Sequence, residues 1–326
     1  MHAWQEWDRL RDRLPHAVLI RAGEGMGEFE FGKAAAQGLL CENRGAARQG
    51  CGVCPACHWF GQGNHPDFRL IVPESMAPES QEEGDVPAKK EKRSEQIRIE
   101  QIRALADFLA VGTHRAGLRV ILIYPADSMN ANTQNALLKN LEEPPPATVF
   151  LLISTQPGRL LATVRSRCLN FTIPRPDPVQ AAKWLKEQGI AHPEPALAGA
   201  GGAPLTALKL AETDSERERF LEGLRDPEFD PISLAERTQR VSLVELVTWL
   251  QRWSFDLLLF RIVGRIRYHV KNEKLIGDIS RDCDPAELAA YLRRLAQARS
   301  LAQHPLNARL FVEDLLLQYQ KLIVRS

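Results

Sequence analysis

Short apolar runs alternate with stretches of helical periodicity between residues 17 and 173, and no other feature constrains the fold of this chain as strongly. Such an alternation is typical of an α/β domain, in which crossover helices join the strands of a parallel sheet. The apolar runs predict strands at residues 18–20, 68–72, 119–123, 148–154 and 169–173. Helical spacing predicts one crossover helix with Ile99, Ile102, Leu105 and Leu109 on its apolar face, and another with Ala136, Leu137 and Leu141.

The composition is that of a globular protein with room for two or three domains. The chain has 326 residues, of which 44% are hydrophobic and 25% charged. Its 42 Lys and Arg residues nearly balance 41 Asp and Glu residues, so it lacks the positive field of a protein that grips nucleic acid by itself. Apolar runs such as 149–153 are far shorter than a membrane span. We therefore expect a cytoplasmic protein that does not contact a membrane.

The remainder of the chain is helical in character. We expect a helix that begins at Asp177 and Pro178 and ends near Gly189, followed by a second helical stretch. A charged connection over 212–231 leads to a region where Trp249, Trp253 and many leucines repeat at helical spacing, most simply as core residues. The organisation predicted is a parallel-sheet domain over 1–174 with a mobile charged loop at 74–95, a small helical unit over 175–212 and a helical bundle over 213–326.

Four of the six cysteines lie close together in the chain, at Cys41, Cys51, Cys54 and Cys57. A spacer of two residues lets neighbouring thiolates face one centre, at about 2.3 Å from a zinc ion. Two overlapping CxxC pairs favour a closed zinc site, and the alternative is a redox-active or metal-free group of thiols. Four protein ligands leave no position for water or substrate, so the zinc would be structural. Neither His58 nor His65 is expected to be a ligand.

A glycine-rich segment follows the first strand, where a nucleotide-binding P-loop would lie. A working P-loop has the pattern G-x-x-x-x-G-K-[ST], in which lysine neutralises the phosphates and the hydroxyl holds Mg²⁺. Gly25 and Gly27 are present, but Glu28 stands at the lysine position and Phe29 at the hydroxyl position. A carboxylate repels polyphosphate, and a phenyl ring cannot bind a metal.

The strand at 119–123 shows a second departure of the same kind. It ends in Tyr124 and Pro125, where a Walker B motif would supply acidic residues for Mg²⁺ and water. Two independent elements therefore lack their catalytic residues, and we predict that the chain has no functional site for ATP and Mg²⁺. Asp127 lies beyond the end of the strand and is expected to cap a helix.

Together these motifs resemble those of the DNA polymerase III delta prime subunits, a family within the bacterial clamp-loader group of AAA+ proteins. The resemblance covers most of residues 16–210. It rests on His16-Ala17, the cysteine cluster, His65-Pro66-Asp67, Asn135 to Lys139 with Leu141 to Pro145, and Arg165 to Cys168. It implies a P-loop NTPase-like (AAA+) domain with an inserted zinc module at 41–57, a helical lid at 175–212, and a C-terminal all-α collar at 213–326 that joins subunits.

The resemblance also implies a role for Arg167, which lies between Ser166 and Cys168. It would act as an arginine finger, in trans, in the ATP site of an adjacent ATPase subunit. A guanidinium suits this role because it is planar and permanently charged, and stabilises the charge that grows on phosphate oxygens. The plainer alternative is that Arg165 and Arg167 only solvate a loop before the fifth strand.

The implied function is that of a non-hydrolysing clamp-loader subunit of the bacterial replicative polymerase holoenzyme. It would assemble with ATPase subunits of the gamma/tau type and with a delta-type subunit to load the sliding clamp on primed DNA, and would itself lack ATPase and polymerase activity. An active AAA+ ATPase subunit is the alternative, which residues 28–29 and 124–125 argue against. A zinc-dependent DNA-binding module is a third, which the near-neutral charge does not favour.

Overall fold

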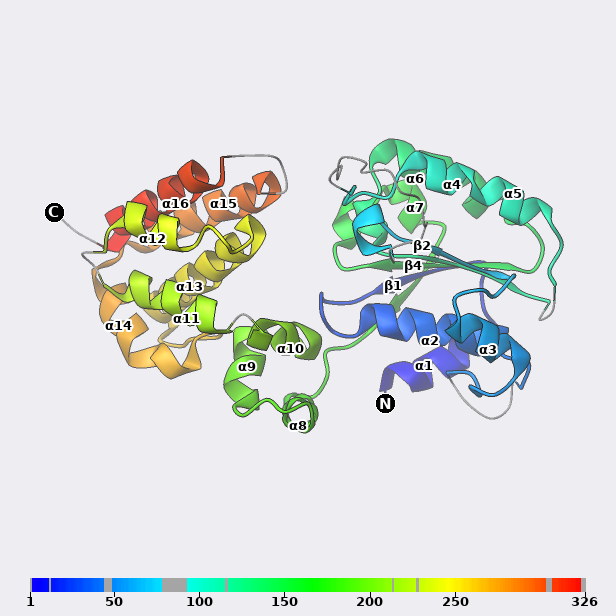
Figure 1. The fold of residues 1–326 in the computed structure, drawn as a ribbon, viewed down its shortest axis with the longest axis horizontal. Coiled ribbons are helices and arrows are strands. Elements are labelled where there is room, and N and C mark those ends of the chain that lie inside the picture. The colour runs from blue at the N-terminus through cyan, green and yellow to red at the C-terminus, as the bar shows by residue number, and fades with distance from the viewer. Residues whose placement is uncertain are drawn as a thin grey trace, which may run out of the picture. The chain divides into compact units, whose positions relative to one another are not determined.

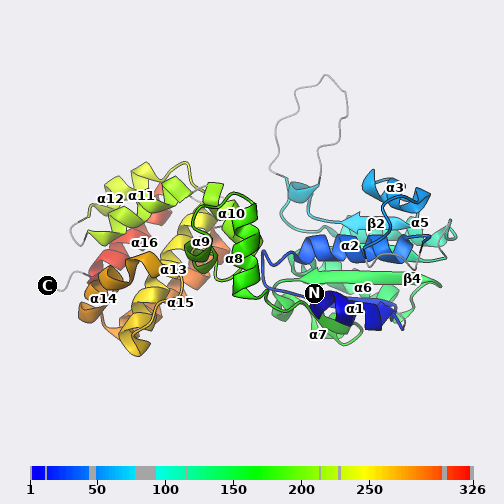
Figure 2. The same ribbon diagram turned by 90° about the horizontal axis from the view of Figure 1, so that it is seen from below.

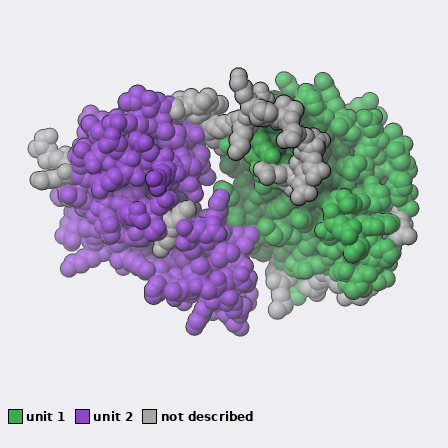
Figure 3. All heavy atoms as spheres, viewed as in Figure 1, with its two compact units in different colours: residues 1–175 green, residues 176–326 purple. Residues whose placement is uncertain are grey.

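The computed structural model describes residues 2–11, 13–43, 49–77, 93–114, 117–212, 214–226, 229–302 and 307–323. The chain divides into two compact units, residues 1–175 and 176–326 (Figure 3). The division into three domains that the sequence suggests stays a prediction. Among the described helices, none is both long and apolar enough to span a membrane.

The first unit is built on a parallel sheet whose strand order is β2-β3-β4-β1-β5 (Figure 1). The strands are β1 (Ala17–Arg21), β2 (Phe68–Ile71), β3 (Arg119–Ile123), β4 (Thr148–Ser154) and β5 (Leu169–Thr172). The register places Leu19 of β1 beside Leu152 of β4 and Asn170 of β5. All five predicted strands are confirmed to within one residue at each end, and so is the parallel α/β fold.

Alternate strand residues face opposite sides of the sheet, and helices cover both sides (Figure 1). One side carries α1 (His2–Arg11), α2 (Glu28–Leu40) and α3 (Pro55–Gly61), and the other carries α4 (Ile99–Arg103), α5 (Leu105–Ala110), α6 (Ala131–Glu142) and α7 (Ala162–Arg165). Ile20 and Leu122 pack with Trp7 and Phe31 on the first side. Each fully buried side chain of this size contributes roughly 1.5–3 kcal/mol, so the sheet is a rigid support for the loops at its ends.

Two helices replace the one predicted through Ile99 and Leu109. The chain turns at Ala104, between α4 and α5. In α5 the ring of Phe108 lies against the guanidinium groups of Arg69, at 4.7 Å, and Arg119, at 5.1 Å. The prediction of a single helix was wrong at Ala104, although Ile102, Leu105 and Leu109 still pack into one core cluster, as the predicted apolar face implies. The helix α6 does end before Pro144, as the proline run predicts.

The charged loop predicted at 74–95 falls mostly outside the described residues, which omit 78–92. Its two ends are close together. Glu74, in a 3-10 helix (Glu74–Met76), accepts a hydrogen bond from the N–H of Ser94 and forms an ion pair with Arg98 at 3.0 Å.

The second unit is helical, with no strand among its described residues. It contains α8 (Pro178–Glu187), α9 (Pro193–Gly199), α10 (Pro204–Glu212), α11 (Asp214–Arg225), α12 (Pro231–Arg237), α13 (Leu243–Val263), α14 (Glu273–Asp282), α15 (Pro285–Leu301) and α16 (Ala308–Ile323). Asp177 caps α8 through the N–H groups of Val179 and Gln180, as predicted. Helices α11 and α12 lie along one side of the bundle (Figure 2).

Helix α11 occupies a segment that the sequence analysis treated as a charged connection, and that prediction was wrong. Most of the helix is charged, but Phe220, Leu221 and Leu224 are buried and join the core of the bundle. Three apolar side chains within five residues are enough to anchor a helix whose other faces are solvated.

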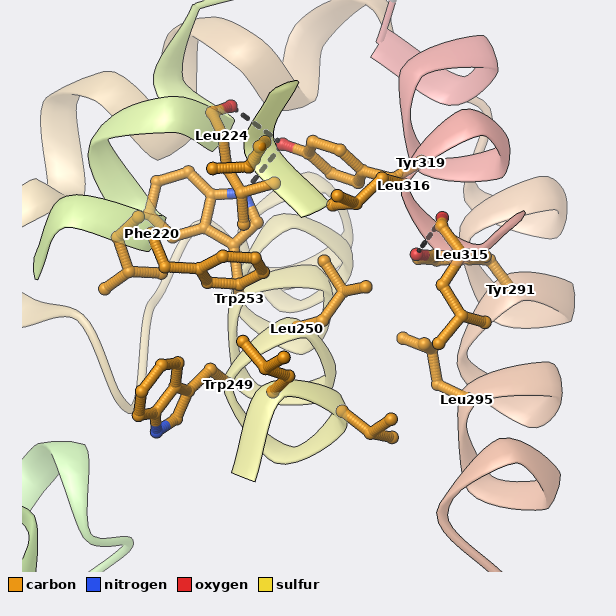
Figure 4. Close-up of a cluster of buried hydrophobic side chains, with 14 of the residues drawn as sticks. Phe220, Leu224, Trp249, Leu250, Trp253, Tyr291, Leu295, Leu315, Leu316 and Tyr319 are labelled. Carbon is orange, nitrogen blue, oxygen red and sulfur yellow. Dashed lines mark hydrogen bonds between the residues drawn. The ribbon is translucent and has the colours of Figure 1, made fainter. Parts of the chain in front are cut away.

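The bundle core surrounds α13, and Trp249 and Trp253 lie in it, as predicted. The indole N–H of Trp253 donates to the Tyr319 hydroxyl at 2.7 Å, and this hydroxyl donates to the carbonyl of Leu224 (Figure 4). Polar groups that are satisfied in this way fix the packing of a core.

Candidate functional site

The loop between β1 and α2 has the backbone of an anion-binding turn. Gly25 and Gly27 adopt φ angles of 74° and 84°, in the left-handed region that favours glycine. Gly27 is the N-cap residue of α2, so the first N–H groups of this helix have no partner within the helix itself. A helix N-terminus of this kind attracts negative charge.

Glu28 supplies that negative charge from within the chain. Its side chain is buried, with 3% exposed. The carboxylate accepts hydrogen bonds from the N–H of Met26 at 2.9 Å and the N–H of Gly25 at 3.3 Å. The Tyr124 hydroxyl donates to the same carboxylate at 3.2 Å. The carboxylate of Glu28 therefore occupies two N–H groups of the loop that follows β1.

Phe29 of α2 and Tyr124, just past the end of β3, lie in contact with each other. The rings of Phe29 and Tyr124 are stacked, with centroids 4.7 Å apart and planes at 25°. Burial, followed by the charge of Glu28, raises the pKa of Tyr124. The hydroxyl of Tyr124 consequently stays protonated at neutral pH and remains a donor. Pro125 follows it and precedes a 3-10 helix, Ala126–Ser128.

Asp127 does not cap a helix, so that prediction was wrong. Its buried carboxylate accepts hydrogen bonds from the Ser154 hydroxyl at 2.5 Å and the N–H groups of Thr155 and Gln156, just past the end of β4. Asn130 caps α6 instead, by accepting from the N–H of Thr133. Asp127 ties the chain after β3 to the chain after β4, which holds the ends of these strands in place.

The four clustered cysteines form a second site, after α2. Their sulfur atoms all lie within 4.8 Å of one another, and those of Cys41 and Cys54 are 3.9 Å apart. A tetrahedral zinc ion with bonds of about 2.3 Å separates its sulfur ligands by about 3.8 Å. The group could therefore hold one tetrahedral metal ion. Among the described residues, His58 instead lies 3.0 Å from the Gln62 amide, and His65 accepts from the N–H of Asp67.

Backbone N–H groups surround the sulfur atoms. The N–H of Cys51 donates to Cys41, that of Cys54 to Cys51, and that of Cys57 to Cys54, over 3.3–3.4 Å. Hydrogen bonds from Val53 and Cys54 lower the pKa of Cys51 to about 6, whereas burial raises that of Cys57 to about 12. N–H donors of this kind stabilise thiolate ligands.

A glycine permits the close approach of the chain at this site. Gly50 has a φ angle of 87°, and a Cβ atom there would lie 3.1 Å from the sulfur of Cys57. Helix α3 then begins at Pro55, and Cys54 is its N-cap, with the Cys54 sulfur accepting from the N–H of Cys57.

The segment from Ser166 to Cys168 forms the turn between α7 and β5. Arg167 donates to the Thr163 carbonyl at 2.9 Å, and its guanidinium forms an ion pair with Glu142 of α6 at 2.5 Å. About a third of the Arg167 side chain is exposed, as is about half of Glu142. Cys168 is buried, which raises the pKa of its thiol to about 11. The sequence analysis did not identify Glu142 as the partner, although it lies in a motif that carries the resemblance.

The first unit is thus an α/β domain with a parallel sheet, a glycine-containing turn that a buried carboxylate closes, and a cluster of four cysteines that could hold a metal ion. The chain matches the model of a family described as "DNA polymerase III, delta subunit" over residues 5–177. It is 33% identical to DNA polymerase III subunit delta' of Pseudomonas aeruginosa, over 99% of this chain and 98% of the relative. The same subunit of Escherichia coli is 28% identical, over 94% and 89%. The chain belongs to the family of DNA polymerase III delta prime subunits.

Solved structures also resemble it. A DNA polymerase III gamma subunit-related protein of Thermotoga maritima has a TM-score of 0.47 and 14% identity, over 99% of this chain and 100% of the other.

Proposed function

We propose that this chain is a clamp-loader subunit that does not hydrolyse ATP and that supplies Arg167 to the ATP site of a neighbouring ATPase subunit. Its family membership supports the clamp-loader role. One observation carries the absence of hydrolysis: the Glu28 carboxylate occupies the N–H groups of the β1–α2 turn.

The electrostatics of that turn oppose a nucleotide. A phosphate oxygen placed about 4 Å from the Glu28 carboxylate would be repelled by about 4 kcal/mol at an effective dielectric constant of 20. Displacing the carboxylate would break its hydrogen bonds to Gly25, Met26 and Tyr124, each with a net contribution of about 1 kcal/mol. No lysine or hydroxyl takes over at residues 28 and 29, and Tyr124 and Pro125 offer no carboxylate to Mg²⁺.

The Ser166–Cys168 segment differs from that turn, because its charged residue, Arg167, is only loosely held. The pair between Arg167 and Glu142 is partly exposed to water, and such a pair contributes about 1 kcal/mol or less. An arginine finger raises the rate of phosphoryl transfer by roughly 10³ to 10⁵, which corresponds to about 4–7 kcal/mol. The free-energy cost of releasing Arg167 from Glu142 is therefore small compared with the stabilisation that the guanidinium offers to a transition state.

For the cysteine cluster we propose structural zinc. Cys41, Cys51, Cys54 and Cys57 would hold the ion, and the four sulfur ligands leave no place for a substrate. The zinc would stabilise residues 41–57 locally, because the buried cluster among the described residues of this segment consists of the cysteines and Ala56.

The partners that fit this function are ATPase subunits of the gamma/tau type, a delta-type subunit, the sliding clamp and primed DNA. The near balance of charge in the whole chain favours DNA contact through the assembled complex. The helical region at 213–326 would act as the collar, and its exposed apolar residues, such as Ile262 and Leu310, would contact neighbouring subunits.

Reconstitution tests this function directly. ATPase subunits, a delta-type subunit, the clamp and primed DNA are mixed with and without the chain, and clamp loading and ATP turnover are measured. We expect loading only when the chain is present, and no turnover by the chain alone. Turnover by the isolated chain that disappears when Gly25 to Phe29 is altered would contradict the proposal.

A further inference from the structure

The second unit contains a pocket of about 370 Å³ that none of the sites above uses. It lies between α9 and α10 on one side and, on the other, α13 with the segment that joins α13 to α14. Its lining includes Ala196, Gly199, Trp249, Arg252 and Lys271. Small-molecule sites in proteins begin at roughly 300 Å³, so this pocket has room for a ligand.

Trp249 brings a hydrogen-bond donor to the pocket. Its side chain is 1% exposed, and its indole N–H has no hydrogen-bond partner among the described residues. Figure 4 shows the indole nitrogen on the side of the ring turned away from the hydrophobic cluster. In Trp253, one turn further along α13, the N–H is satisfied by Tyr319. A buried N–H without a hydrogen-bond partner is unfavourable. A ligand in the pocket could provide the acceptor that the Trp249 N–H lacks.

The charged groups of the lining favour an anion. Arg217, Arg252 and Lys271 contribute three positive charges, and Glu218 contributes one negative charge, 3.8 Å from Arg217. Leaving the histidines aside, the formal charge of the lining is 3 − 1 = +2. Guanidinium groups bind phosphate and carboxylate oxygens through paired N–H donors.

The wall that carries these groups is fixed from behind. The buried carboxylate of Asp256 accepts hydrogen bonds from the N–H groups of Arg267, Tyr268 and His269, at 2.8–2.9 Å. The Arg252 guanidinium lies over the Tyr268 ring, 5.6 Å from its centroid. The lining is therefore held in one arrangement, which a ligand site requires.

We propose that this pocket binds a small organic phosphate of nucleotide size. Its phosphate would lie among Arg252, Arg217 and Lys271, and an acceptor atom of the ligand would receive the Trp249 N–H. The volume favours an organic phosphate over inorganic phosphate, which would leave most of the pocket to water. The pocket lies in the second unit and is independent of the β1–α2 turn in the first.

Nuclear magnetic resonance of the full chain labelled with ¹⁵N-tryptophan tests this proposal. The indole signal that disappears in Trp249→Phe belongs to Trp249. It is followed while adenosine 5′-monophosphate, adenosine or inorganic phosphate is added. We expect the monophosphate to shift this signal with a dissociation constant below about 1 mM, and adenosine to bind at least roughly 10-fold more weakly.

Two variants and a matched control separate binding from folding. Arg252→Gln should weaken the binding of adenosine 5′-monophosphate roughly 10-fold, as the loss of one hydrogen bond to a charged group implies. Lys271→Ala should weaken it roughly threefold, because this side chain is exposed. Lys274→Ala removes an exposed lysine outside the pocket and should bind like the unaltered chain. A Trp249 signal that neither phosphate moves at about 10 mM overturns the proposal, as do equal affinities in all variants.

Discussion

The β1–α2 turn and the Ser166–Cys168 segment each carry a charged residue on which the proposed function depends, but the two residues differ in what they contact. Glu28 is buried and bonded to three groups of its own chain. Arg167 is about one-third exposed and held by a single surface ion pair and a carbonyl. A polar group that is fully satisfied inside the chain is closed to ligands, whereas a loosely held one is available to a partner. The same chain can therefore lack a nucleotide site and still serve another subunit.

The largest effect is expected from Arg167→Ala in the assembled loader. Turnover at the ATP site next to this chain should fall by about 10³ or more, because the developing charge on phosphate loses its guanidinium. Single-turnover hydrolysis measures this step. Arg165→Ala, which removes an exposed arginine at the end of α7, is the matched control and should leave the rate unchanged. Equal rates for the two variants would remove the proposed role of Arg167.

Cys54→Ser should have the next largest effect, on the cysteine cluster. Replacing one sulfur weakens metal binding, and we expect loss of bound zinc together with a fall in Tm of about 10 °C or more. Metal analysis and thermal unfolding measure both. The control is Cys283→Ser, whose buried sulfur donates to the Ile279 carbonyl in the second unit, and which should retain its zinc. Zinc retained at full stoichiometry in Cys54→Ser would contradict a four-sulfur site.

Glu28→Ala tests whether the Glu28 carboxylate holds the β1–α2 turn. It leaves the N–H groups of Gly25 and Met26 without their acceptor, so the free energy of unfolding should fall by about 1–3 kcal/mol. Urea denaturation measures the change. Glu30→Ala alters an exposed carboxylate in the same turn of helix and should have little effect. If both variants are equally stable, the carboxylate of Glu28 does not hold the turn.

Tyr124→Phe should lower the free energy of unfolding by about 1 kcal/mol at pH 7, since it removes the hydrogen bond to Glu28. The pKa of Tyr124 is raised in the folded chain, so above its ordinary value of about 10 the unfolded state loses the proton first. The unaltered chain therefore loses stability as pH rises beyond about 10, and the difference from Tyr124→Phe should narrow. A difference in the free energy of unfolding between the two chains that is constant from pH 7 to pH 11 would argue against the burial of the Tyr124 hydroxyl.

The smallest effect is expected from Glu142→Gln. It removes a partly exposed ion pair, so stability should change by only about 0.5 kcal/mol. Turnover by the assembled loader should be unchanged or slightly faster, because Arg167 is freed from its internal partner. A loss of turnover comparable to that of Arg167→Ala would mean that Glu142 positions the guanidinium in the complex.

The sequence predicted what depends on local pattern. Strand positions follow from apolar runs, the start of α8 from Asp177 and Pro178, and the cysteine cluster from its spacing. In α11 the three buried apolar residues were outweighed by the surrounding charge, so the helix was missed.

Contacts between distant residues could not be read in the same way. The contacts join residues that are far apart in the sequence: Glu28 and Tyr124 are separated by 96 positions, Arg167 and Glu142 by 25, and Asp127 and Ser154 by 27. The sequence analysis identified Glu28 and Tyr124 as separate losses. Their hydrogen bond depends on the order of strands in the sheet, in which β4 separates β1 from β3 and helix α2, which follows β1, contacts β3.

The amide signals of Gly25 and Met26 test the closure of the β1–α2 turn most directly, because they report on this turn and not on the pocket of the second unit. Mg²⁺ and ATP are added to the ¹⁵N-labelled chain while these two signals are followed. We predict that neither signal moves, since both N–H groups already donate to Glu28. Saturable shifts of both signals, accompanied by ATP cleavage, would contradict the account.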